Sequence, residues 1–445
     1  MNERDSEIIE QLLVPAGFLP ISDINEADLI LLNTCSIRAK AEQKVYSLLG
    51  QLRQYKFKNP GLLIGVAGCV AQQEGERIQQ KMPHVDLVVG TQQLYRIQEL
   101  VARLDQGQSL GPSIGLDKGF RIPSLLEISP GSMTVPSPAP QEFKKFVTIM
   151  QGCNNYCSYC VVPYTRGRET SRPVADILEE VRALTSRGGC DITLLGQNVN
   201  SYGQTNSVAD TPRTFADLLR QVAAVPGLKR LRFTTSNPKD LTDELMRCFA
   251  EIPILCPHFH LPVQSGSDRV LAGMNRKYTA GDYLELVATL RHYHSDLALT
   301  TDIIVGFPGE TDEDFERTME LLEAVRFHGS FSFKYSDRPG TRSAAFDNKV
   351  SERVKSERLS RFQRRQDEIS LERNIEYMDK ILDVMVEGEG RNGLLQGRSA
   401  YNHIVHFPAV AEIELQPGDV IRVRIHKAGQ HSLTGTLLLE EQHHD

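Results

Sequence analysis

The 445-residue sequence lacks several features, and each absence removes a class of protein. No apolar run approaches the roughly 18 residues that a membrane span requires, and no signal peptide opens the chain, so we expect no membrane contact. Eight cysteines in a chain of this length do not suggest a disulfide framework, and thiols kept reduced in the cytoplasm fit better. Basic residues are not in excess, since the formal net charge is −7, which argues against non-specific adhesion to nucleic acid. No internal repeat has the spacing of a solenoid.

The remaining composition is that of an ordinary soluble protein, with 40% hydrophobic and 24% charged residues. The length predicts about three domains. Any contact with RNA must come from a local basic surface, because the chain as a whole is acidic.

Three cysteines stand close together in the segment 152–160, at intervals of four and three residues: Cys153, Cys157 and Cys160. Thiolates are the usual protein ligands of iron–sulfur clusters, and three of them at these intervals can reach one cluster from a tight loop. A cubane has four irons, so three thiolates leave one iron open to chelate a small molecule. The alternatives are three buried structural cysteines or a zinc loop short of one ligand. Zinc loops normally use C-x2-C pairs and a separate second pair, which does not follow here.

This C-x3-C-x2-C loop resembles the signature of the radical S-adenosylmethionine (SAM) enzymes. The segments 146–153 and 160–169 resemble the methylthiotransferase family of that superfamily, most closely its branch that acts on dimethylallyladenosine in tRNA. The resemblance implies a [4Fe-4S] cluster on Cys153, Cys157 and Cys160 whose open iron binds SAM. It also implies that the reduced cluster cleaves SAM to a 5′-deoxyadenosyl radical and that Tyr159 lies beside the adenine.

Residues 1–104 alternate helical and strand patterns, which predicts an N-terminal doubly wound, flavodoxin-like α/β domain. We expect strands at Phe18–Ser22, Ala27–Asn33, Leu62–Ala67 and Val85–Val89, and helices at Glu7–Leu13, Ala39–Leu52 and Leu94–Leu104.

Two cysteines follow consecutive predicted strands of this domain, Cys35 and Cys69. The carboxyl ends of the strands form the edge where open α/β sheets bind ligands. Each cysteine alone could be a small buried thiol. In methylthiotransferases this domain holds a second [4Fe-4S] cluster on three cysteines, which supplies or activates the sulfur, so the resemblance implies that Cys35 and Cys69 are two of its ligands.

The sequence departs from the family at its start. The third ligand of the N-terminal cluster normally precedes a Met-Asn-x-x-Asp-Ser-Glu segment, and this sequence begins with that segment at Met1. A doubly wound unit should also start with a strand, whereas this one starts on a helix and its first strand is missing. We therefore expect a start codon assigned too far downstream. A real loss of the cysteine would leave a non-catalytic iron–sulfur RNA-binding protein as the alternative.

Residues 105–141 are rich in Pro, Gly and Ser and predict a linker. A βα rhythm resumes over 142–372, and its six strands suggest a partial (β/α)6 barrel, as radical SAM domains have. The expected strands are Phe146–Met150, Asp191–Leu195, Arg230–Thr234, Phe259–Leu261, Leu299–Val305 and Ser330–Tyr335.

Chemistry in such barrels gathers at the carboxyl ends of the strands. Four residues there are plausible SAM contacts together with Tyr159: Gln197, Ser236, Gln264 and Gly306. Each could also be an ordinary cap or turn residue. Glycine additionally lets the backbone approach a ligand closely. Three further cysteines match no family ligand position, and we expect them in the core: Cys190, Cys248 and Cys256.

The C-terminal part of the chain carries the candidates for RNA contact. The segment Lys349–Arg373 is rich in basic residues and is either a solvated helix with internal ion pairs or a phosphate-facing surface. Residues 375–441 change to short alternating strands with glycine turns and predict a small β-barrel that resembles the TRAM domain, an RNA-binding barrel. Four of its residues combine a cation, an aromatic ring and polar groups suited to loop RNA: Arg398, Tyr401, Asn402 and His403.

Together these features predict a cytoplasmic, monomeric radical SAM methylthiotransferase. Its expected substrate is N6-(dimethylallyl)adenosine beside the anticodon, bound in the tRNA anticodon stem-loop, and its product is the 2-methylthio derivative. The resemblance implies SAM, two [4Fe-4S] clusters, a sulfur source and a low-potential electron donor such as flavodoxin or ferredoxin. A sister enzyme that acts on threonylcarbamoyladenosine in tRNA, or on an aspartate of a ribosomal protein, remains a second possibility.

Overall fold

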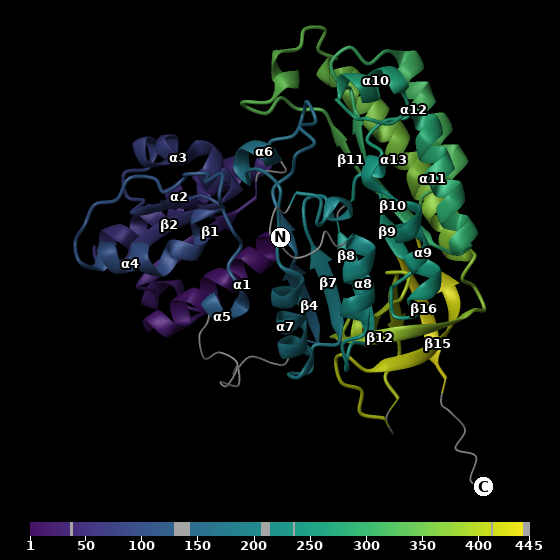
Figure 1. Cartoon of the computed structure of the whole chain (residues 1–445), viewed down its shortest axis with the longest axis horizontal. Coiled ribbons are helices and arrows are strands. Elements are labelled where there is room, and N and C mark those ends of the chain that lie inside the picture. The colour runs from purple at the N-terminus through teal and green to yellow at the C-terminus, as the bar shows by residue number, and fades with distance from the viewer. Residues whose placement is uncertain (36–38, 129–142, 206–213, 235, 411–412, 439–445) are drawn as a thin grey trace. The chain divides into compact units, whose positions relative to one another are not determined.

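The computed structural model describes all residues except 36–38, 129–142, 206–213, 235, 411–412 and 439–445 (Figure 1). The chain forms two compact units. Unit 1 contains residues 1–136, 148–156 and 160–180, and unit 2 contains residues 137–147, 157–159 and 181–445. Within the part of the chain that the structure describes, no helix combines the length and apolarity needed to cross a bilayer.

Unit 1 is built on a parallel sheet of the strands β1 (Leu29–Thr34), β2 (Leu63–Gly68) and β3 (Leu87–Val89), in that order. The strands β2 and β3 are apolar and almost fully buried, as expected for a parallel sheet between two helical layers, whereas β1 at the edge of the sheet is half-buried.

Helices cover both faces of this sheet: α1 (Asn2–Leu13), α2 (Ala39–Lys58), α3 (Cys69–Lys81), α4 (Ile97–Asp105) and the short α5 (Leu125–Ile128). The apolar stripes of α1 and α4 pack on one face against Leu87 and Val89. The helices α2 and α3 pack on the other face against Ile64 and Val88. The predicted doubly wound arrangement is therefore confirmed.

The strand expected at Phe18–Ser22 was wrong. No strand forms there among the described residues, and Leu19 and Ile21 are exposed. Gly17 has φ +94° and Pro20 lacks a backbone N–H, so the segment turns and is poorly suited to join a sheet ladder. Phe18 alone packs on the core of unit 1.

Unit 1 also takes in a segment from the middle of the chain. It contains the two-stranded pair β5 (Met150–Gln151) and β6 (Thr170–Ser171) and the short helix α6 (Val162–Thr165). A buried ion-pair network holds this segment to α1: Glu180 accepts from Arg4 at 2.8 Å and from Arg172 at 2.6 Å. The side chains of these three residues are at most 7% exposed.

Unit 2 contains the predicted six strands, in two three-stranded sheets whose order follows the chain. They are β4 (Lys144–Thr148), β7 (Asp191–Leu195), β8 (Arg230–Thr234), β9 (His258–His260), β10 (Ala298–Val305) and β11 (Gly329–Lys334). An isolated parallel bridge pairs Leu231 of β8 with Leu255, which precedes β9. The partial (β/α)6 barrel is thus confirmed, with strand bounds within two residues of those expected.

Helices lie between the strands along the chain: α7 (Val174–Thr185), α8 (Phe215–Ala223), α9 (Asp243–Glu251), α10 (Asp268–Gly273), α11 (Ala280–Tyr293), α12 (Asp312–Val325) and α13 (Glu352–Ile375). Capping boxes begin α8, α11 and α12, with Thr214, Thr279 and Thr311 as the N-caps. Each threonine satisfies an unpaired backbone N–H in the first turn, which fixes where the helix starts. The chain also contains single-turn 3-10 helices at Val14–Ala16, Ile24–Glu26, Gln93–Arg96, Val199–Ser201, Pro238–Asp240, Arg342–Ala345 and Arg391–Gly393.

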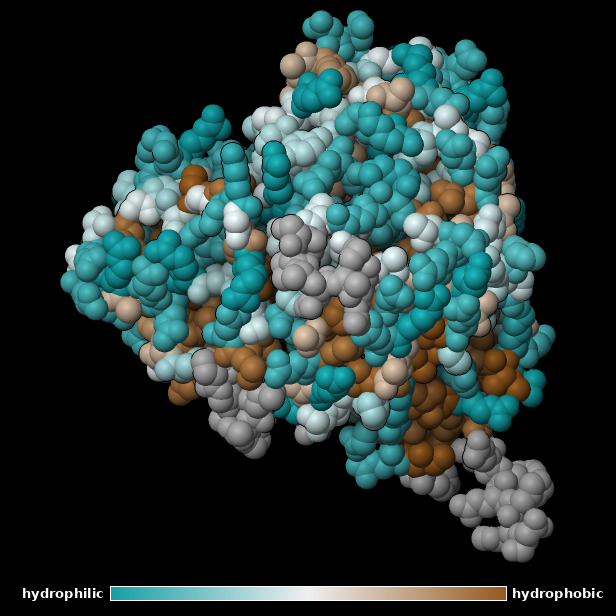
Figure 2. All heavy atoms as spheres, in the orientation of Figure 1, coloured by the Kyte–Doolittle hydropathy of each residue, from teal (hydrophilic) through white to brown (hydrophobic). Residues whose placement is uncertain are grey.

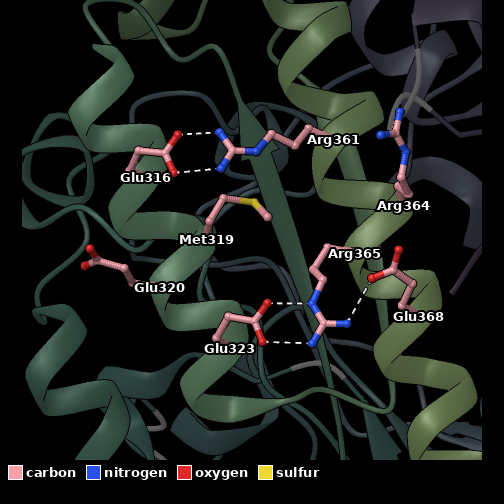
Figure 3. A pocket seen from close by; sticks show the side chains of 8 residues that line it. All are labelled: Glu316, Met319, Glu320, Glu323, Arg361, Arg364, Arg365 and Glu368. Atoms are coloured by element: carbon pink, nitrogen blue, oxygen red, sulfur yellow. Dashed lines mark hydrogen bonds and ion pairs between the residues drawn. The ribbon is translucent and has the colours of Figure 1, made fainter.

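The basic segment predicted at Lys349–Arg373 forms α13, and the structure supports its interpretation as an ion-paired helix. Arg361 meets both oxygens of Glu316 on α12, and Arg365 meets both oxygens of Glu323, as Figure 3 shows. Glu368 adds a second partner to Arg365 at 3.0 Å. The carboxylates of α12 therefore neutralise much of the positive charge that phosphate would need.

The C-terminal strands close into a small barrel in the order β12-β13-β14-β16-β15. The strands are β12 (Ile381–Glu389), β13 (Leu395–Ser399), β14 (Ile404–Phe407), β15 (Val420–Ala428) and β16 (Ser432–Leu437). On the face shown in Figure 2 the surface over α12 is mainly hydrophilic. Near the barrel strands the same face shows a hydrophobic area.

The barrel is anchored to the N-terminal ends of the strands in unit 2. Arg230 donates to the backbone oxygens of Arg398 and Asp383, and Arg232 donates to those of Ser399 and Ala400. Because buried guanidinium groups satisfy these carbonyls, the barrel and the central strands form one packed body.

Candidate functional site

The loop with the three clustered cysteines contains no helix or strand over residues 152–161. Cys153, Cys157 and Cys160 form no disulfide among the described residues and are partly exposed, so the interpretation as buried structural cysteines does not hold. Cys153 and Cys160 belong to unit 1 and Cys157 to unit 2, and each is described within its own unit.

Within unit 2, short hydrogen bonds fix the backbone around Cys157. The Ser158 N–H donates to the Met274 carbonyl at 2.9 Å, and its hydroxyl donates to the Gly273 carbonyl at 2.9 Å. Tyr159 packs against the apolar cluster around Phe307 and Met274. A tyrosine that is packed on one side and partly exposed can offer its ring to a planar group, as expected for a residue beside adenine.

The Cys157 sulfur accepts a hydrogen bond from the guanidinium of Arg276 at 3.4 Å. Burial lowers the pKa of this guanidinium, but Tyr159, Tyr278 and Cys157 together raise it well above its ordinary value. Arg276 therefore keeps its positive charge at any working pH.

Within unit 1, the start of the loop lies against the segment that follows it. Gly152 has φ +83°, and a Cβ there would lie 2.2 Å from the Arg168 carbonyl oxygen, so only glycine fits. The Cys153 N–H donates to the Gly167 carbonyl at 3.3 Å, and the Asn155 amide donates to the Cys153 sulfur at 3.4 Å. The motif around 163–169 thus shapes the ligand loop.

No group of three His, Cys, Asp or Glu side chains in the described ranges is close enough to hold a single metal ion. The thiolates of a cubane each bind a different iron and need not converge as the ligands of one ion do.

The structure brings Cys35 and Cys69 to the same edge of the sheet in unit 1. They directly follow Thr34 and Gly68, which are paired in the register of the adjacent strands β1 and β2. Gly68 is required there, because a Cβ would lie 2.4 Å from the Thr34 carbonyl oxygen. Cys69 is the first residue of α3 and directly follows this glycine.

A second arginine lies beside this pair. Arg166 forms a buried ion pair with Asp5 at 2.5 Å and also contacts the Cys69 thiol. Burial lowers the pKa of Arg166, but Asp5 and Cys69 raise it above its ordinary value. The neighbourhood of Cys69 therefore has the positive charge that a thiolate ligand needs.

The expected SAM contacts lie at the carboxyl ends of three strands of unit 2. Gln197 is partly exposed after β7, whereas Ser236 after β8 and Gln264 just beyond β9 are buried. The Ser236 hydroxyl has no hydrogen-bond partner among the described residues. A buried, unpaired hydroxyl is rare unless a ligand or water completes it, so this position suits a polar ligand.

Gly306 after β10 has φ +72°. A Cβ there would lie 2.3 Å from Cγ of Lys355, so the close approach that glycine permits is to α13. Its N–H donates at 2.7 Å to Glu310, which also pairs with Arg358 at 2.8 Å. Burial raises the pKa of Glu310, although Arg358 lowers it. Glu310, at the end of the loop after β10, therefore fixes the start of the loop at Gly306.

The four residues expected to contact RNA lie together at the β13–β14 turn, partly exposed. Tyr401 and His403 each pack against Tyr377, with ring centroids 5.6 and 4.5 Å apart. Arg398 donates to Glu387 at 3.0 Å and to the Asn402 carbonyl at 3.1 Å. Burial lowers the pKa of His403 to about 4, so its imidazole is neutral at physiological pH.

Sequence reasoning missed the two arginines that reach cysteine sulfurs. Arg166 lies in a segment that carried the family resemblance, but nothing in the sequence paired it with Cys69. Arg276 is 119 residues from Cys157, so no local pattern could have linked them. The expectation that Cys190, Cys248 and Cys256 are core thiols is confirmed, since all three are at most 7% exposed.

Three family models match successive parts of the chain. The radical SAM superfamily matches residues 147–322, the uncharacterized protein family UPF0004 matches residues 1–90, and the TRAM domain matches residues 377–438. The third match agrees with the closed barrel, and the first agrees with the βα strands of unit 2.

Curated relatives match over nearly the full chain. A tRNA-2-methylthio-N(6)-dimethylallyladenosine synthase of Desulfotalea psychrophila is 60% identical over 99% of this chain and 97% of its own length. A protein of the same name from Geotalea uraniireducens is 47% identical over 98% of this chain and 96% of its own length.

Among solved structures, the chain is similar to the radical S-adenosylmethionine methyltransferase TsrM from Kitasatospora setae, with a TM-score of 0.53 and 16% identity. The match covers 77% of this chain and 67% of that chain. At this identity the likeness supports the fold alone.

Proposed function

Because the chain belongs to the family of tRNA-2-methylthio-N(6)-dimethylallyladenosine synthases, we propose that it converts N6-(dimethylallyl)adenosine 3′ of the tRNA anticodon (position 37) to its 2-methylthio derivative. The observation that carries this is the 60% identity over 99% of the chain to a relative of that name. The enzyme is a radical SAM methylthiotransferase, with an iron–sulfur cluster and SAM as its cofactors.

Cys153, Cys157 and Cys160 would hold the SAM-binding cluster through their thiolates. When bound, this cluster would supply the electron for reductive cleavage of SAM, and the hydrogen at C2 of the adenine is the atom to be abstracted. The protein's part is to place the three thiols on a loop fixed by Gly152 and Ser158, and to leave them accessible. Their partial exposure supports this role.

SAM would lie along the carboxyl ends of the strands in unit 2, where Tyr159, Gln197, Ser236, Gln264 and Gly306 are its proposed contacts. The unpaired hydroxyl of Ser236 offers a hydrogen bond to the ribose or carboxylate of SAM. Gln264 has φ +76°, and its backbone is fixed by hydrogen bonds to Asp302 and Ile304. These features orient a ligand and do not themselves carry out chemistry.

A second cluster, held in part by Cys35 and Cys69, would supply the sulfur. Their adjacent positions at one sheet edge support this, as does the nearby Arg166. The proposal includes a sulfur source, a low-potential donor such as flavodoxin or ferredoxin, and action as a monomer. A cytoplasmic location is part of it, and the eight cysteines, none of which forms a disulfide in the described structure, suit a reducing compartment.

The C-terminal barrel would bind the tRNA anticodon stem-loop. The TRAM match supports this role, and Arg398, Tyr401, Asn402 and His403 are the proposed contacts. Because Tyr401 and His403 also pack on Tyr377, only their exposed edges are available to a base.

The test is anaerobic incubation of the reconstituted protein with SAM, dithionite and tRNA that carries dimethylallyladenosine, followed by mass analysis of the nucleosides. We expect the 2-methylthio nucleoside together with 5′-deoxyadenosine. Substrate tRNA without the dimethylallyl group and the variant Cys157→Ser are the controls, and neither should give the product.

Other outcomes would reject the substrate assignment. Modification of threonylcarbamoyladenosine, or of a ribosomal-protein aspartate, would identify a sister enzyme. Absence of 5′-deoxyadenosine from protein with a full complement of iron would reject the enzyme altogether.

A further inference from the structure

Two hydrogen bonds, besides its contact with Cys157, hold the guanidinium of Arg276 in one orientation. Its Nε donates to the Tyr278 hydroxyl at 2.7 Å, and one terminal nitrogen donates to the Pro262 carbonyl at 2.8 Å. The Tyr278 hydroxyl in turn donates to the Val263 carbonyl at 3.0 Å. The remaining terminal nitrogen is left to the Cys157 sulfur, 3.4 Å away.

The same short segment holds both partners of this contact. Met274 accepts from the N–H of Ser158, next to Cys157, and Arg276 follows two residues after Met274. Asn275 between them has φ +60°, a tight turn that asparagine tolerates. The position of the guanidinium relative to the sulfur is therefore built by the protein and does not depend on a bound cluster.

The charge of Arg276 has no carboxylate to neutralise it. In the described part of the chain no Asp or Glu lies within ion-pair distance of Arg276, whereas Arg358, Arg361 and Arg365 all meet carboxylates. A cation with no carboxylate partner is expected where an anion will bind. Here the guanidinium contacts the Cys157 sulfur, which would carry negative charge as a cluster ligand.

We propose that Arg276 is a positioning residue that raises the reduction potential of the cluster held by Cys153, Cys157 and Cys160. This rests on the proposed function, which places a cluster on that loop. One-electron reduction adds negative charge to a thiolate-bound cluster, so a fixed cation and a hydrogen bond to a ligand sulfur stabilise the reduced state more than the oxidised one. The external donor supplies the electron, and Arg276 itself gains and loses nothing.

The test is a redox titration of the full-length, anaerobically reconstituted protein, followed by electron paramagnetic resonance. Cys35→Ala and Cys69→Ala are introduced in all samples, so that the signal comes from the central loop. Arg276→Met removes both charge and donors, whereas Arg276→Lys keeps the charge. Arg247→Met is the matched control, because Arg247 is exposed on α9 and pairs with Asp243 at 2.7 Å.

We expect Arg276→Met to shift the midpoint potential to a more negative value, Arg276→Lys to shift it less, and Arg247→Met to leave it unchanged. In the protein with all its cysteines, Arg276→Met should form 5′-deoxyadenosine more slowly with dithionite and recover with the stronger reductant titanium(III) citrate. A purely structural role would lower iron content and give no such recovery.

An unchanged potential in Arg276→Met with full iron content would overturn the inference. If that variant loses its iron, the Arg276→Lys titration decides, and wild-type values there would overturn it as well. A wild-type protein that shows no cluster signal from the central loop would instead reject the proposed function, and the inference with it.

Discussion

Replacement of Glu180 by glutamine is the sharpest test of how unit 1 is held together. The Glu180 side chain is 2% exposed, and its oxygens accept from Arg4 at 2.8 Å and Arg172 at 2.6 Å. Burial raises the pKa of Glu180, but the guanidinium groups of Arg172 and Arg4 lower it by more than burial raises it. The net shift of the pKa is therefore downward. The carboxylate is therefore charged in the folded protein and is the shared partner of two buried cations.

The expected cost follows from the loss of that shared charge. An amide keeps the shape of the side chain but leaves the two arginines without their common counter-ion. Breaking a buried pair in this way costs about 3–5 kcal/mol. At about 1.4 kcal/mol for each tenfold change, local opening should become roughly 100-fold to 4,000-fold more frequent.

Hydrogen exchange measured by mass spectrometry is the suitable assay, because a chain with two units need not unfold in one step. Peptides from α1 should exchange faster in Glu180→Gln by that factor, while peptides from β15 should be unaffected. Since the folded pKa of Glu180 lies below its unfolded value, this contribution is present at neutral pH and is lost as pH falls below about 4.5. Equal exchange of α1 in wild type and variant at pH 7 would refute the reasoning.

Two other perturbations test the cysteine edge of unit 1 and the docking of the barrel. Gly68→Ala should lower the iron bound by the N-terminal cysteines and destabilise unit 1 by about 1–3 kcal/mol from backbone strain alone. Gly17 also has a positive φ but has open space around it, so Gly17→Ala should cost less stability and leave the bound iron unchanged. Equal iron loss in both variants would contradict the clash at Gly68. Burial lowers the pKa of His328 to about 3 and of His403 to about 4. Because these folded values lie below the unfolded value near 6.5, stability is present above pH 6.5 and falls by up to about 3 kcal/mol per histidine as pH drops toward 4; hydrogen exchange in β13 and β14 should rise over that range, and a flat profile would contradict it.

The strand and helix pattern could be predicted where burial on both faces made apolar runs continuous. The strands β2 and β10 were expected within one residue of their ends, because apolar runs bounded by turns leave little choice. The segment 18–22 failed because an apolar composition alone does not show whether a neighbouring strand is available to pair with. Helix α13 could not be interpreted from its own charges, since the acids that neutralise it lie on α12.

Some features of the candidate site could also be predicted from the sequence, whereas others depend on contacts that only the fold creates. The three clustered candidate cysteines are visible in the sequence because their spacing is local, whereas the left-handed conformation of Gly152 became apparent only in the structure. The side chains that set the electrostatics of these cysteines are not visible in the sequence, because Arg276 reaches Cys157 only through the fold. The packing of Tyr401 and His403 against Tyr377 was equally hidden, since the sequence shows an aromatic platform but not which of its faces is covered.

The measurement that tests the central claim most directly compares SAM cleavage by wild-type protein with cleavage by Cys153→Ser, Cys157→Ser and Cys160→Ser. All four proteins are reconstituted with iron and sulfide without oxygen and are given SAM and dithionite. The account predicts that wild type releases 5′-deoxyadenosine and that each variant releases none, while iron bound at Cys35 and Cys69 remains. Formation of 5′-deoxyadenosine by any of the three variants at the wild-type rate would contradict it.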